Sequence, residues 1–256
     1  MFRKAIVRPP ARNFASGLTS VDLGAPVFEI ALAQHEAYCA ALERCGLTLI
    51  RLPADERFPD ATFVEDTAVI TTRGAIIARP GAPTRAGETE EIAEVLAQIY
   101  PSVQRIEAPG TVDGGDVCEA GDHFLIGISA RTNEAGAKQL AGMLNELGYQ
   151  ATLVDIRNVD GILHLKSGMV CLADNLFVVI EGLAQRAELA GYDLLRVTRG
   201  EEYAANCVQV NEFVLVAAGF PVLEQTLQKF GHQTLALSMS EFQKMDGGLS
   251  CLSLRF

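Results

Sequence analysis

The sequence predicts an α/β fold, a closed radial array of about five strand–strand–helix–strand units. One four-part pattern recurs along the 256 residues, with a period of roughly 45–50 residues that is typical of radial arrays. The two ends of the chain each supply part of a unit that the other end lacks, and joining them would leave no free sheet edge. A doubly wound sheet is the competing fold, but it requires strands and helices that alternate strictly, whereas here a hairpin precedes each helix.

The first unit along the chain is the split one. Residues 4–7 form a strand-like apolar run, residues 27–45 are expected to form a helix, and residues 47–52 a second strand. A lone strand over residues 250–256 at the other end of the chain would complete this unit.

The four other units are continuous in sequence. In the first of them, a turn at Arg73-Gly74 joins two strands, and apolar residues at helical spacing follow. The hairpins are expected at 62–78, 112–128, 163–180 and 207–217, the helices at 84–100, 133–147, 183–189 and 222–230, and the closing strands at 103–106, 151–156, 194–197 and 234–237. No linker or low-complexity segment interrupts the pattern, which indicates a single domain over residues 1–256.

Composition narrows the function classes. A hydrophobic content of 49% is ample for a core, and a net charge of −11 argues against nucleic-acid and anionic-membrane partners. Residues 1–7 lead directly into a strand pattern rather than a secretory signal, and no apolar stretch reaches the roughly 18 residues that a membrane helix needs. We therefore expect a cytoplasmic protein with a small-molecule partner.

The six cysteines do not form any Cys-x-x-Cys pair, so we expect neither a structural zinc site nor disulfides. Most of these thiols are expected to be small core residues. Cys251 differs, because the pair Gly247-Gly248 delivers it to the entrance of the last expected strand. It is the best candidate for a nucleophile.

Polar residues of chemical interest recur at one phase of the repeat, near the start of each unit's first strand. Each has an ordinary explanation as a solvated strand end, a turn, a core histidine or an inert thiol, but equivalent positions of a radial array converge on its axis. His35, His123 and His232 lie outside this phase and are interpreted as surface residues. The candidates are Glu65, Asp66, Asp113, Asp116, His164 and Cys251.

Five segments together resemble dimethylarginine dimethylaminohydrolase, a guanidino-modifying enzyme family of the pentein fold. They are Thr-Phe-Val-Glu-Asp at 62–66, Asp-Gly-Gly-Asp at 113–116, Leu-His-Leu-Lys-Ser at 163–167, Tyr-Ala-Ala-Asn-Cys at 203–207 and Asp-Gly-Gly-Leu-Ser-Cys at 246–251. The resemblance covers nearly the whole chain in order. It implies a five-bladed α/β propeller, which agrees with the five units expected from periodicity.

The resemblance also implies roles for individual residues. Cys251 matches the nucleophile, His164 the general acid and base, and Asp113 the acidic residue of the catalytic group. Glu65 and Asp66 match residues that line the guanidinium-binding region. The remaining matches are Arg85 and Arg131, which would hold the substrate carboxylate, Leu18, Asp60 and Met245, which would surround its α-amino end, and the loop 13–19, which would close over the site.

The chemistry of a guanidinium explains these residue types. Resonance makes its carbon a poor electrophile, so a thiolate is the suitable nucleophile, and a histidine can protonate the leaving amine and then activate water. The implied products are citrulline and dimethylamine from Nω,Nω-dimethyl-L-arginine. No metal or other cofactor is required. The oligomeric state implied is a monomer or a homodimer.

Lys166 bears on the choice of guanidine. Arginine and agmatine deiminases usually carry Asp two places after the catalytic histidine, and losing that carboxylate favours a methylated substrate. The rival readings are a deiminase of another small guanidine such as free arginine, a non-catalytic pentein binding protein, and a cysteine-dependent amide hydrolase. Arg85 and Arg131 favour a substrate with a carboxylate, and papain-like signatures are absent.

Overall fold

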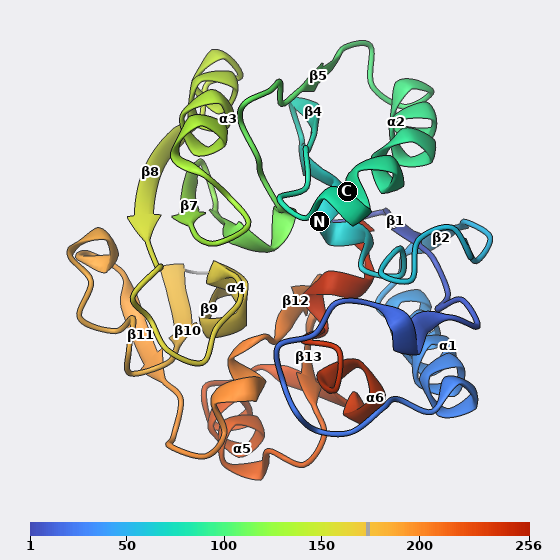
Figure 1. Ribbon diagram of the computed structural model, residues 1–256. Helices are drawn as coiled ribbons and strands as arrows, with labels where there is room; N and C mark the ends of the chain where they lie inside the picture. Colours follow the sequence, from blue (N-terminus) through green and yellow to red (C-terminus); the bar gives the residue numbers. More distant parts are fainter. Residues whose placement is uncertain (173–174) are drawn as a thin grey trace. The chain divides into compact units, whose positions relative to one another are not determined.

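The computed structural model describes residues 1–172 and 175–256 (Figure 1). Within them the strands form five separate three-stranded sheets. In sheet order these are β15 (Leu254–Arg255), β1 (Lys4–Val7) and β2 (Thr48–Arg51); β3 (Ala68–Thr71), β4 (Gly74–Ile77) and β5 (Val103–Arg105); β6 (Val117–Ala120), β7 (His123–Ile128) and β8 (Gln150–Asp155); β9 (Met169–Leu172), β10 (Leu176–Val179) and β11 (Asp193–Arg196); and β12 (Val208–Val210), β13 (Phe213–Ala217) and β14 (Gln233–Leu237).

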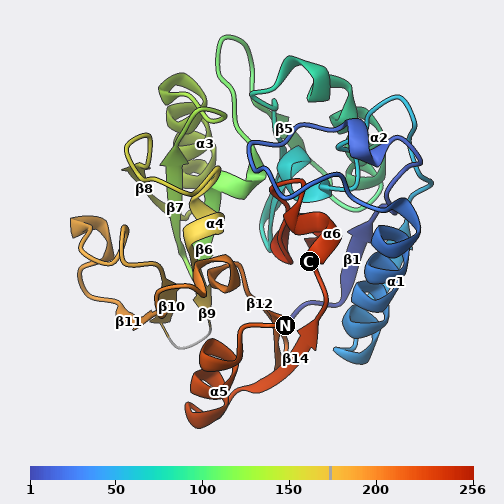
Figure 2. The same ribbon diagram turned by 60° about the horizontal axis from the view of Figure 1, so that its bottom comes forward.

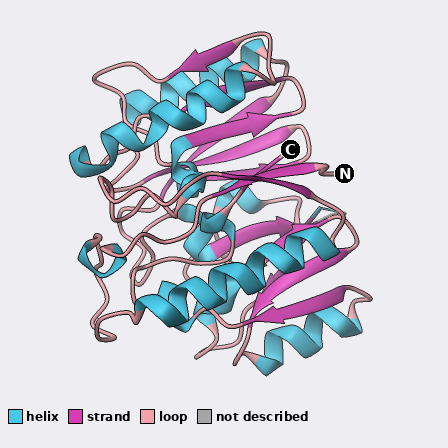
Figure 3. Ribbon diagram, turned by 90° about the vertical axis from the view of Figure 1, so that its right-hand side faces the viewer, coloured by secondary structure: helices cyan, strands magenta, loops and turns pink. Residues whose placement is uncertain are grey.

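Every sheet has the same topology. The central strand pairs antiparallel with one neighbour and parallel with the other, as β4 does with β3 and β5. Parallel neighbours need a crossover connection, which a helix supplies in four of the sheets. The α-helices are α1 (Phe28–Arg44), α2 (Thr89–Ala97), α3 (Glu134–Glu146), α4 (Leu165–Gly168), α5 (Pro221–Lys229) and α6 (Ser240–Gln243). Figure 3 shows these helices and the short strands of the α/β fold.

The split unit is confirmed. Strand β1 pairs antiparallel with β15, with Ala5 opposite Arg255 and Ile6 opposite Leu254, and parallel with β2. Phe256 extends this pairing, since its carbonyl accepts hydrogen bonds from the backbone N–H groups of Arg3 and Lys4, both at 2.8 Å. The last strand of the chain therefore completes the sheet that the first strand begins.

The chain divides into two compact units. Residues 1–64 with 198–256 form one unit, which contains the split sheet and the β12–β14 sheet, and residues 65–197 form the other, which contains three sheets. Helix α5 lies beside β14 in the first unit (Figure 2). The single catalytic domain over residues 1–256 stays a prediction.

Each unit has its own buried apolar core. In the unit of residues 1–64 and 198–256, Phe14, Phe63 and Phe242 pack with ring centroids 5.5–6.3 Å apart. In the unit of residues 65–197, Leu140 and Leu144 of α3 pack against Phe124 and Ile126 of β7 in one cluster. The apolar residues of α3 recur at helical spacing and therefore share one face. Side chains along β7 point alternately to its two faces, so Phe124 and Ile126 lie on the same side.

Several expected strands begin with a helical turn instead. The 3₁₀ turns are η1 (Phe14–Ser16), η2 (Val64–Thr67), η3 (Pro83–Glu88), η4 (Gly114–Asp116), η6 (Ala187–Leu189), η7 (Glu202–Ala205) and η8 (Ser250–Leu252). The helix expected over 183–189 is reduced to η6. The turn of the hairpin expected over 163–180 includes Ala173 and Asp174, which lie outside the described residues.

His35 is not a surface residue as predicted. It is 1% exposed on the inner face of α1, where its Nδ1 lies 3.6 Å from Cys39 Sγ. Burial disfavours the charged imidazole and lowers the pKa of His35 to about 4. All six cysteines are free, and four of them are buried, as expected of small core residues. None of the helices in the described parts of the chain has the length and apolarity to cross a membrane.

Candidate active site

The candidate residues lie in helical turns or cap them. Each of these turns comes just before the first strand of a strand–strand–helix–strand unit. Glu65 and Asp66 lie in η2, Asp113 and His164 are the residues that cap the N-termini of η4 and α4, and Cys251 lies in η8. The sequence predicted these residues at the start of strands. In the structure they lie about one helical turn before the strands begin. The shared phase in the repeat, however, is present.

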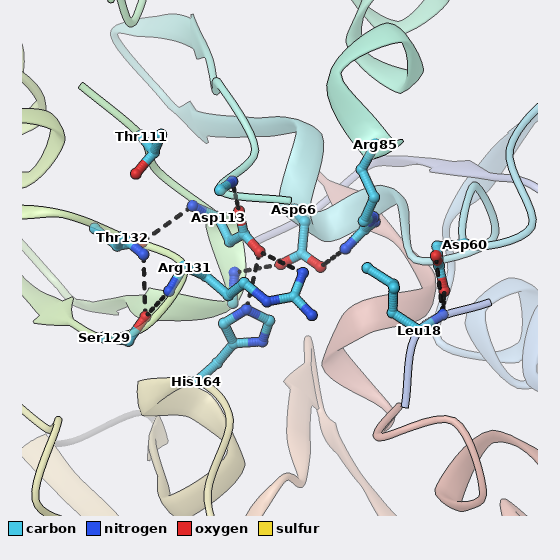
Figure 4. Close-up of polar contacts among 12 residues, drawn as sticks. Leu18, Asp60, Asp66, Arg85, Thr111, Asp113, Ser129, Arg131, Thr132 and His164 are labelled. Atoms are coloured by element: carbon cyan, nitrogen blue, oxygen red, sulfur yellow. Dashed lines mark hydrogen bonds and ion pairs between the residues drawn. The ribbon is translucent and has the colours of Figure 1, made fainter. Parts of the chain in front are cut away.

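An Asp–His pair is buried in the unit of residues 65–197 (Figure 4). His164 Nε2 is 3.1 Å from Asp113 Oδ2, and both side chains are buried. The other carboxylate oxygen of Asp113 accepts a hydrogen bond from Gly81 N at 2.7 Å. Asp113 N in turn donates to Thr132 Oγ1 at 3.0 Å. The carboxylate is thus held in one orientation toward the imidazole.

Asp66 links the pair to an arginine. One oxygen accepts from Gly115 N at 2.8 Å and the other from Arg85 Nη1 at 2.6 Å. Residue 115 must be glycine, because a Cβ there would lie 2.7 Å from His164 Nδ1 and 2.9 Å from Asp66 Oδ1. The close approach of this backbone brings Asp66 and His164 to the same place.

The surrounding charges fix the protonation of the imidazole. Burial by itself would lower the pKa of His164, but the carboxylates of Asp66, Asp116 and Asp113 outweigh it and raise the pKa to about 9. Burial of Asp66 acts to raise its pKa, and the charges of His164 and Arg85 reverse this and lower it. The histidine is therefore cationic at neutral pH and is placed to donate a proton.

The two predicted carboxylate-binding arginines both lie near this cluster. Arg85 is buried and bonds to Asp66 and, through Nε and Nη2, to Glu88. Arg131 is more accessible, with its Nη1 4.0 Å from Asp113 Oδ2. Arg131 is thus the more available of the two cations for a substrate.

Glu65 forms an ion pair with Lys166. The distance from Lys166 Nζ to Glu65 Oε1 is 2.6 Å, and the carboxylate side chain is only 4% exposed. Lys166, two places after His164, therefore neutralises a neighbouring acid.

Cys251 lies in the unit of residues 1–64 and 198–256, on a braced turn. Its half-buried Sγ accepts a hydrogen bond from Gly248 N at 3.4 Å. The side chain of Asn206 bonds twice to Ser250, from Nδ2 to Oγ at 3.0 Å and from Ser250 N to Oδ1 at 2.9 Å. Tyr203 Oη donates to Gly247 O at 2.8 Å. Residues of the 203–207 segment thus hold the turn that carries the thiol.

The residues predicted to surround the substrate α-amino end come together in this same unit. Leu18 N donates to both oxygens of Asp60, at 3.0 and 3.2 Å (Figure 4). A Cβ on Gly17 would collide with Asp60 and would lie 3.2 Å from Met245 Cε. The expected loop 13–19 contains the short turn η1.

Asp66, Asp113 and His164 are also the residues best placed to hold a metal ion, with one ligand atom from each within 4.8 Å of the others. A metal would require a neutral imidazole, whereas the raised pKa of His164 favours the cation. The carboxylates are also already paired with protein groups. A metal-independent site stays the prediction.

Comparison with known proteins identifies the family. A family model described as arginine deiminase matches residues 56–217. The N(G),N(G)-dimethylarginine dimethylaminohydrolase of Pseudomonas aeruginosa is 45% identical, with 100% of both chains aligned. The chain belongs to the dimethylarginine dimethylaminohydrolase family. A relative of that name from Streptomyces coelicolor is 34% identical over 99% of this chain and 96% of its own.

Solved structures agree with the family and the fold class. A mutant of the P. aeruginosa family member, with serine in place of a cysteine and in complex with citrulline, superposes with a TM-score of 0.97 at 44% identity over 100% of both chains. The N-terminal domain of ArgZ, an arginine dihydrolase of cyanobacteria, has a TM-score of 0.89 at 16% identity over 100% of this chain and 97% of that chain, which shows the fold alone. The chain is an α/β protein of the pentein fold with five strand–strand–helix–strand units, as predicted, and a hydrolase of this family.

The sequence interpretation gave no role to Asp116, Asn206 or Tyr203. Asp116 is fully buried in η4 beside the candidate histidine, and the other two brace the cysteine turn. Their signal in the sequence was membership in the motifs 113–116 and 203–207. A role could not be read from that alone, because each acts through a hydrogen bond to a residue far along the chain.

Proposed function

We propose that the protein hydrolyses Nω,Nω-dimethyl-L-arginine to L-citrulline and dimethylamine, and Nω-monomethyl-L-arginine to L-citrulline and methylamine. The observation that carries this proposal is the full-length similarity to the P. aeruginosa enzyme, whose structure holds citrulline. The cationic His164 beside three carboxylates supports it, because the reaction needs a proton donor next to a cationic substrate.

In the proposed mechanism the thiolate of Cys251 attacks the guanidinium carbon. The C–N bond to dimethylamine then breaks while His164 gives its proton to the leaving nitrogen, which leaves an S-alkyl thiouronium on Cys251. The neutral imidazole, held by Asp113, next removes a proton from water. The hydroxide adds to the same carbon, the C–S bond breaks as the added hydroxyl gives up its remaining proton to solvent, and citrulline and the thiolate are released.

The other predicted residues bind the substrate in this proposal. Asp66 faces the guanidinium with negative charge, and Glu65, paired with Lys166, lines the same region. Carboxylate hydrogen bonds suit a planar cation. Arg131 and Arg85 attract the α-carboxylate. The carboxylate of Asp60 and the chain at Leu18 and Met245 receive the α-amino group.

The substrate preference tests the role of Lys166. Its ion pair with Glu65 occupies an acid that could otherwise grip unsubstituted terminal NH groups, so we expect kcat/KM for dimethylarginine to exceed that for arginine. The arginine deiminase family match favours the alternative, a deiminase of free arginine. Citrulline formation from each substrate, with dimethylamine and ammonia measured separately, distinguishes the two. Equal or faster turnover of arginine would contradict the proposed preference.

A non-catalytic binding protein is the second alternative. It predicts saturable binding of methylated arginine without any citrulline, and the same assay detects this outcome. We further propose a cytoplasmic enzyme, since six free thiols suit a reducing compartment. It is expected to act as a monomer or homodimer, which sedimentation equilibrium would resolve.

A further inference from the structure

We propose that Asp116 is a positioning residue that fixes both His164 and the loop of Arg131 through a single buried carboxylate. The proposal rests on the proposed function, in which His164 is the acid and Arg131 a substrate-binding cation. Nothing in that mechanism uses Asp116 directly, yet its side chain is fully buried between the two segments that do.

One oxygen of Asp116 holds the histidine turn. Oδ1 accepts a hydrogen bond from Leu165 N at 3.0 Å, and this N–H belongs to the peptide group that directly follows His164. His164 caps α4, a helix of one turn, and Ser167 Oγ accepts from His164 N at 3.3 Å. A helix of one turn has little stability of its own. The hydrogen bond to Asp116 therefore fixes the position of the backbone that carries the imidazole of His164.

The other oxygen holds the arginine loop. Oδ2 accepts from Ser129 Oγ at 2.6 Å, and Ser129 Oγ accepts from Arg131 N at 2.9 Å and Thr132 N at 3.0 Å. Thr132 Oγ1 accepts from Asp113 N at 3.0 Å (Figure 4). The same network therefore reaches the imidazole, its acidic partner and the arginine.

Accepting hydrogen bonds from both Ser129 Oγ and Leu165 N requires a carboxylate at residue 116. The hydroxyl of Ser129 already accepts two backbone N–H groups, which use both of its lone pairs, so it can only donate to residue 116. An asparagine could accept at one atom, but its NH₂ group would face a hydroxyl that has no acceptor capacity left. Asp116→Asn keeps the size of the side chain and breaks one of the two connections.

Asp116 also acts on His164 by charge. Asp66 of η2 faces the imidazole together with Asp113 and Asp116 of η4, while Arg85 and Arg131 lie beyond Asp66 and Asp113. Burial raises the pKa of Asp116 to about 6, although the charge of His164 and three hydrogen bonds oppose it. The charge of the Asp116 carboxylate in turn favours the imidazolium form of His164.

The test compares full-length wild-type protein with Asp116→Asn and Ser129→Ala. For each, kcat and KM for dimethylarginine are measured as a function of pH, and the Cε1–H resonance of His164 is titrated by NMR, assigned through its loss in His164→Gly. For Asp116→Asn we expect kcat to fall at least about ten-fold and the pKa of His164 to drop by roughly one unit. For Ser129→Ala we expect KM to rise about five-fold or more, while the pKa of His164 falls less than in Asp116→Asn, because residue 116 keeps its carboxylate.

Two outcomes overturn the proposal, and a third contradicts only the proposed function on which it rests. A folded Asp116→Asn protein with kcat within two-fold of wild type and an unmoved His164 titration shows a purely structural carboxylate. An unchanged KM in Ser129→Ala would show that the contact between Asp116 and Ser129 does not position Arg131. This variant is the deciding test if Asp116→Asn fails to fold. Wild-type protein without dimethylarginine turnover contradicts the proposed function instead, and the NMR titration, which needs no turnover, still tests Asp116.

Discussion

At the scale of single residues, the charges around a side chain decide its protonation state. His164 is surrounded by three buried carboxylates and is held cationic, whereas His35 lies in an apolar helix face and is held neutral. The two histidines differ in environment and not in type. The same side chain is therefore a cation in one place and a neutral core residue in another.

Cys251→Ser should abolish turnover and leave the fold intact. A serine hydroxyl is too weak a nucleophile for a guanidinium carbon, and it is close to the thiol in size. Citrulline formation should fall to background, with an unchanged circular dichroism spectrum and melting temperature. Substantial residual activity would refute the assignment of the nucleophile.

His164→Gly should lose most of its activity at neutral pH, because the leaving amine then lacks a proton donor. Citrulline release at pH 7 is the measurement, and a rate within a few-fold of wild type would show that the acid–base role is wrong. His123→Gln is the matched control, since His123 bonds to Tyr192 and Thr152 and not to the candidate site.

The same variant tests the effect of His164 on stability. In the wild-type protein the folded pKa of His164, about 9, lies above the unfolded value of 6.5. The imidazolium therefore contributes fully to the free energy of unfolding below pH 6.5, and this contribution disappears as the pH rises through 9. The loss is on the order of 3 kcal/mol. Urea denaturation from pH 6 to pH 9.5 should show a decline that is smaller in His164→Gly than in His123→Gln. An equal decline in both would contradict this.

At the scale of elements, the functional device is a helical turn placed before an antiparallel strand. The turns η2, η4, α4 and η8 carry the candidate residues at this position, and η7 carries the residues that brace η8. Turns expose backbone N–H groups that carboxylates and amides can bind, as Asp66 does at Gly115 and Asn206 at Ser250. Each repeat unit of the fold thus offers an equivalent turn at which a functional side chain can be held.

Asn206→Ala should disturb the cysteine turn more than the fold. It removes two buried hydrogen bonds to Ser250, each worth about 1 kcal/mol, from the turn that holds Cys251. We expect kcat to fall by about ten-fold or more, since small misplacements of a nucleophile are costly.

Asn211→Gly is the matched control for that variant. Asn211 also bonds to backbone through its side chain, at Phe2 and Cys45, and its φ of 54° is one that glycine accepts. It should lower the melting temperature without lowering kcat. Equal kcat values for both variants would show that Asn206 has no special connection to the nucleophile.

At the scale of the molecule, the two ends of the chain belong to one sheet. The C-terminal strand β15 covers the edge of β1 and follows the cysteine turn directly. The backbone of Phe256 is bonded to Arg3 and Lys4, and Leu254 is buried. A thiol five residues from the end of the chain is therefore held by the first strand.

Deletion of residues 254–256 should destabilise the protein and abolish turnover. It removes the strand pairing of β1 and the burial of Leu254, which together should cost several kcal/mol, on the order of 3. The melting temperature and citrulline formation are the measurements. Phe230→Ser, at an exposed position after α5, is the control and should change neither. Wild-type stability and activity of the truncated protein would contradict the importance of the split sheet.

The sequence alone determined the fold class, the five units and the split of one unit between the termini. Apolar periodicity and turn residues are local signals, and they specify which segments are strands and helices. The motifs also identified the family and the candidate residues. The local pattern failed at 62–67, 163–168 and 250–252, where helical turns stand in place of strands. In the last two segments, the distant side chains of Asp116 and Asn206 accept hydrogen bonds from the turn.

Only the tertiary structure decided which partner each candidate has. The pairing of Asp113 with His164, of Lys166 with Glu65 and of Asn206 with Ser250 joins positions 44 to 101 residues apart. Burial and the sign of neighbouring charges set the pKa of a histidine, and neither can be read from its own stretch of sequence. For that reason the sequence could name the chemical groups, while only the fold placed the carboxylates of Asp66, Asp113 and Asp116 around His164.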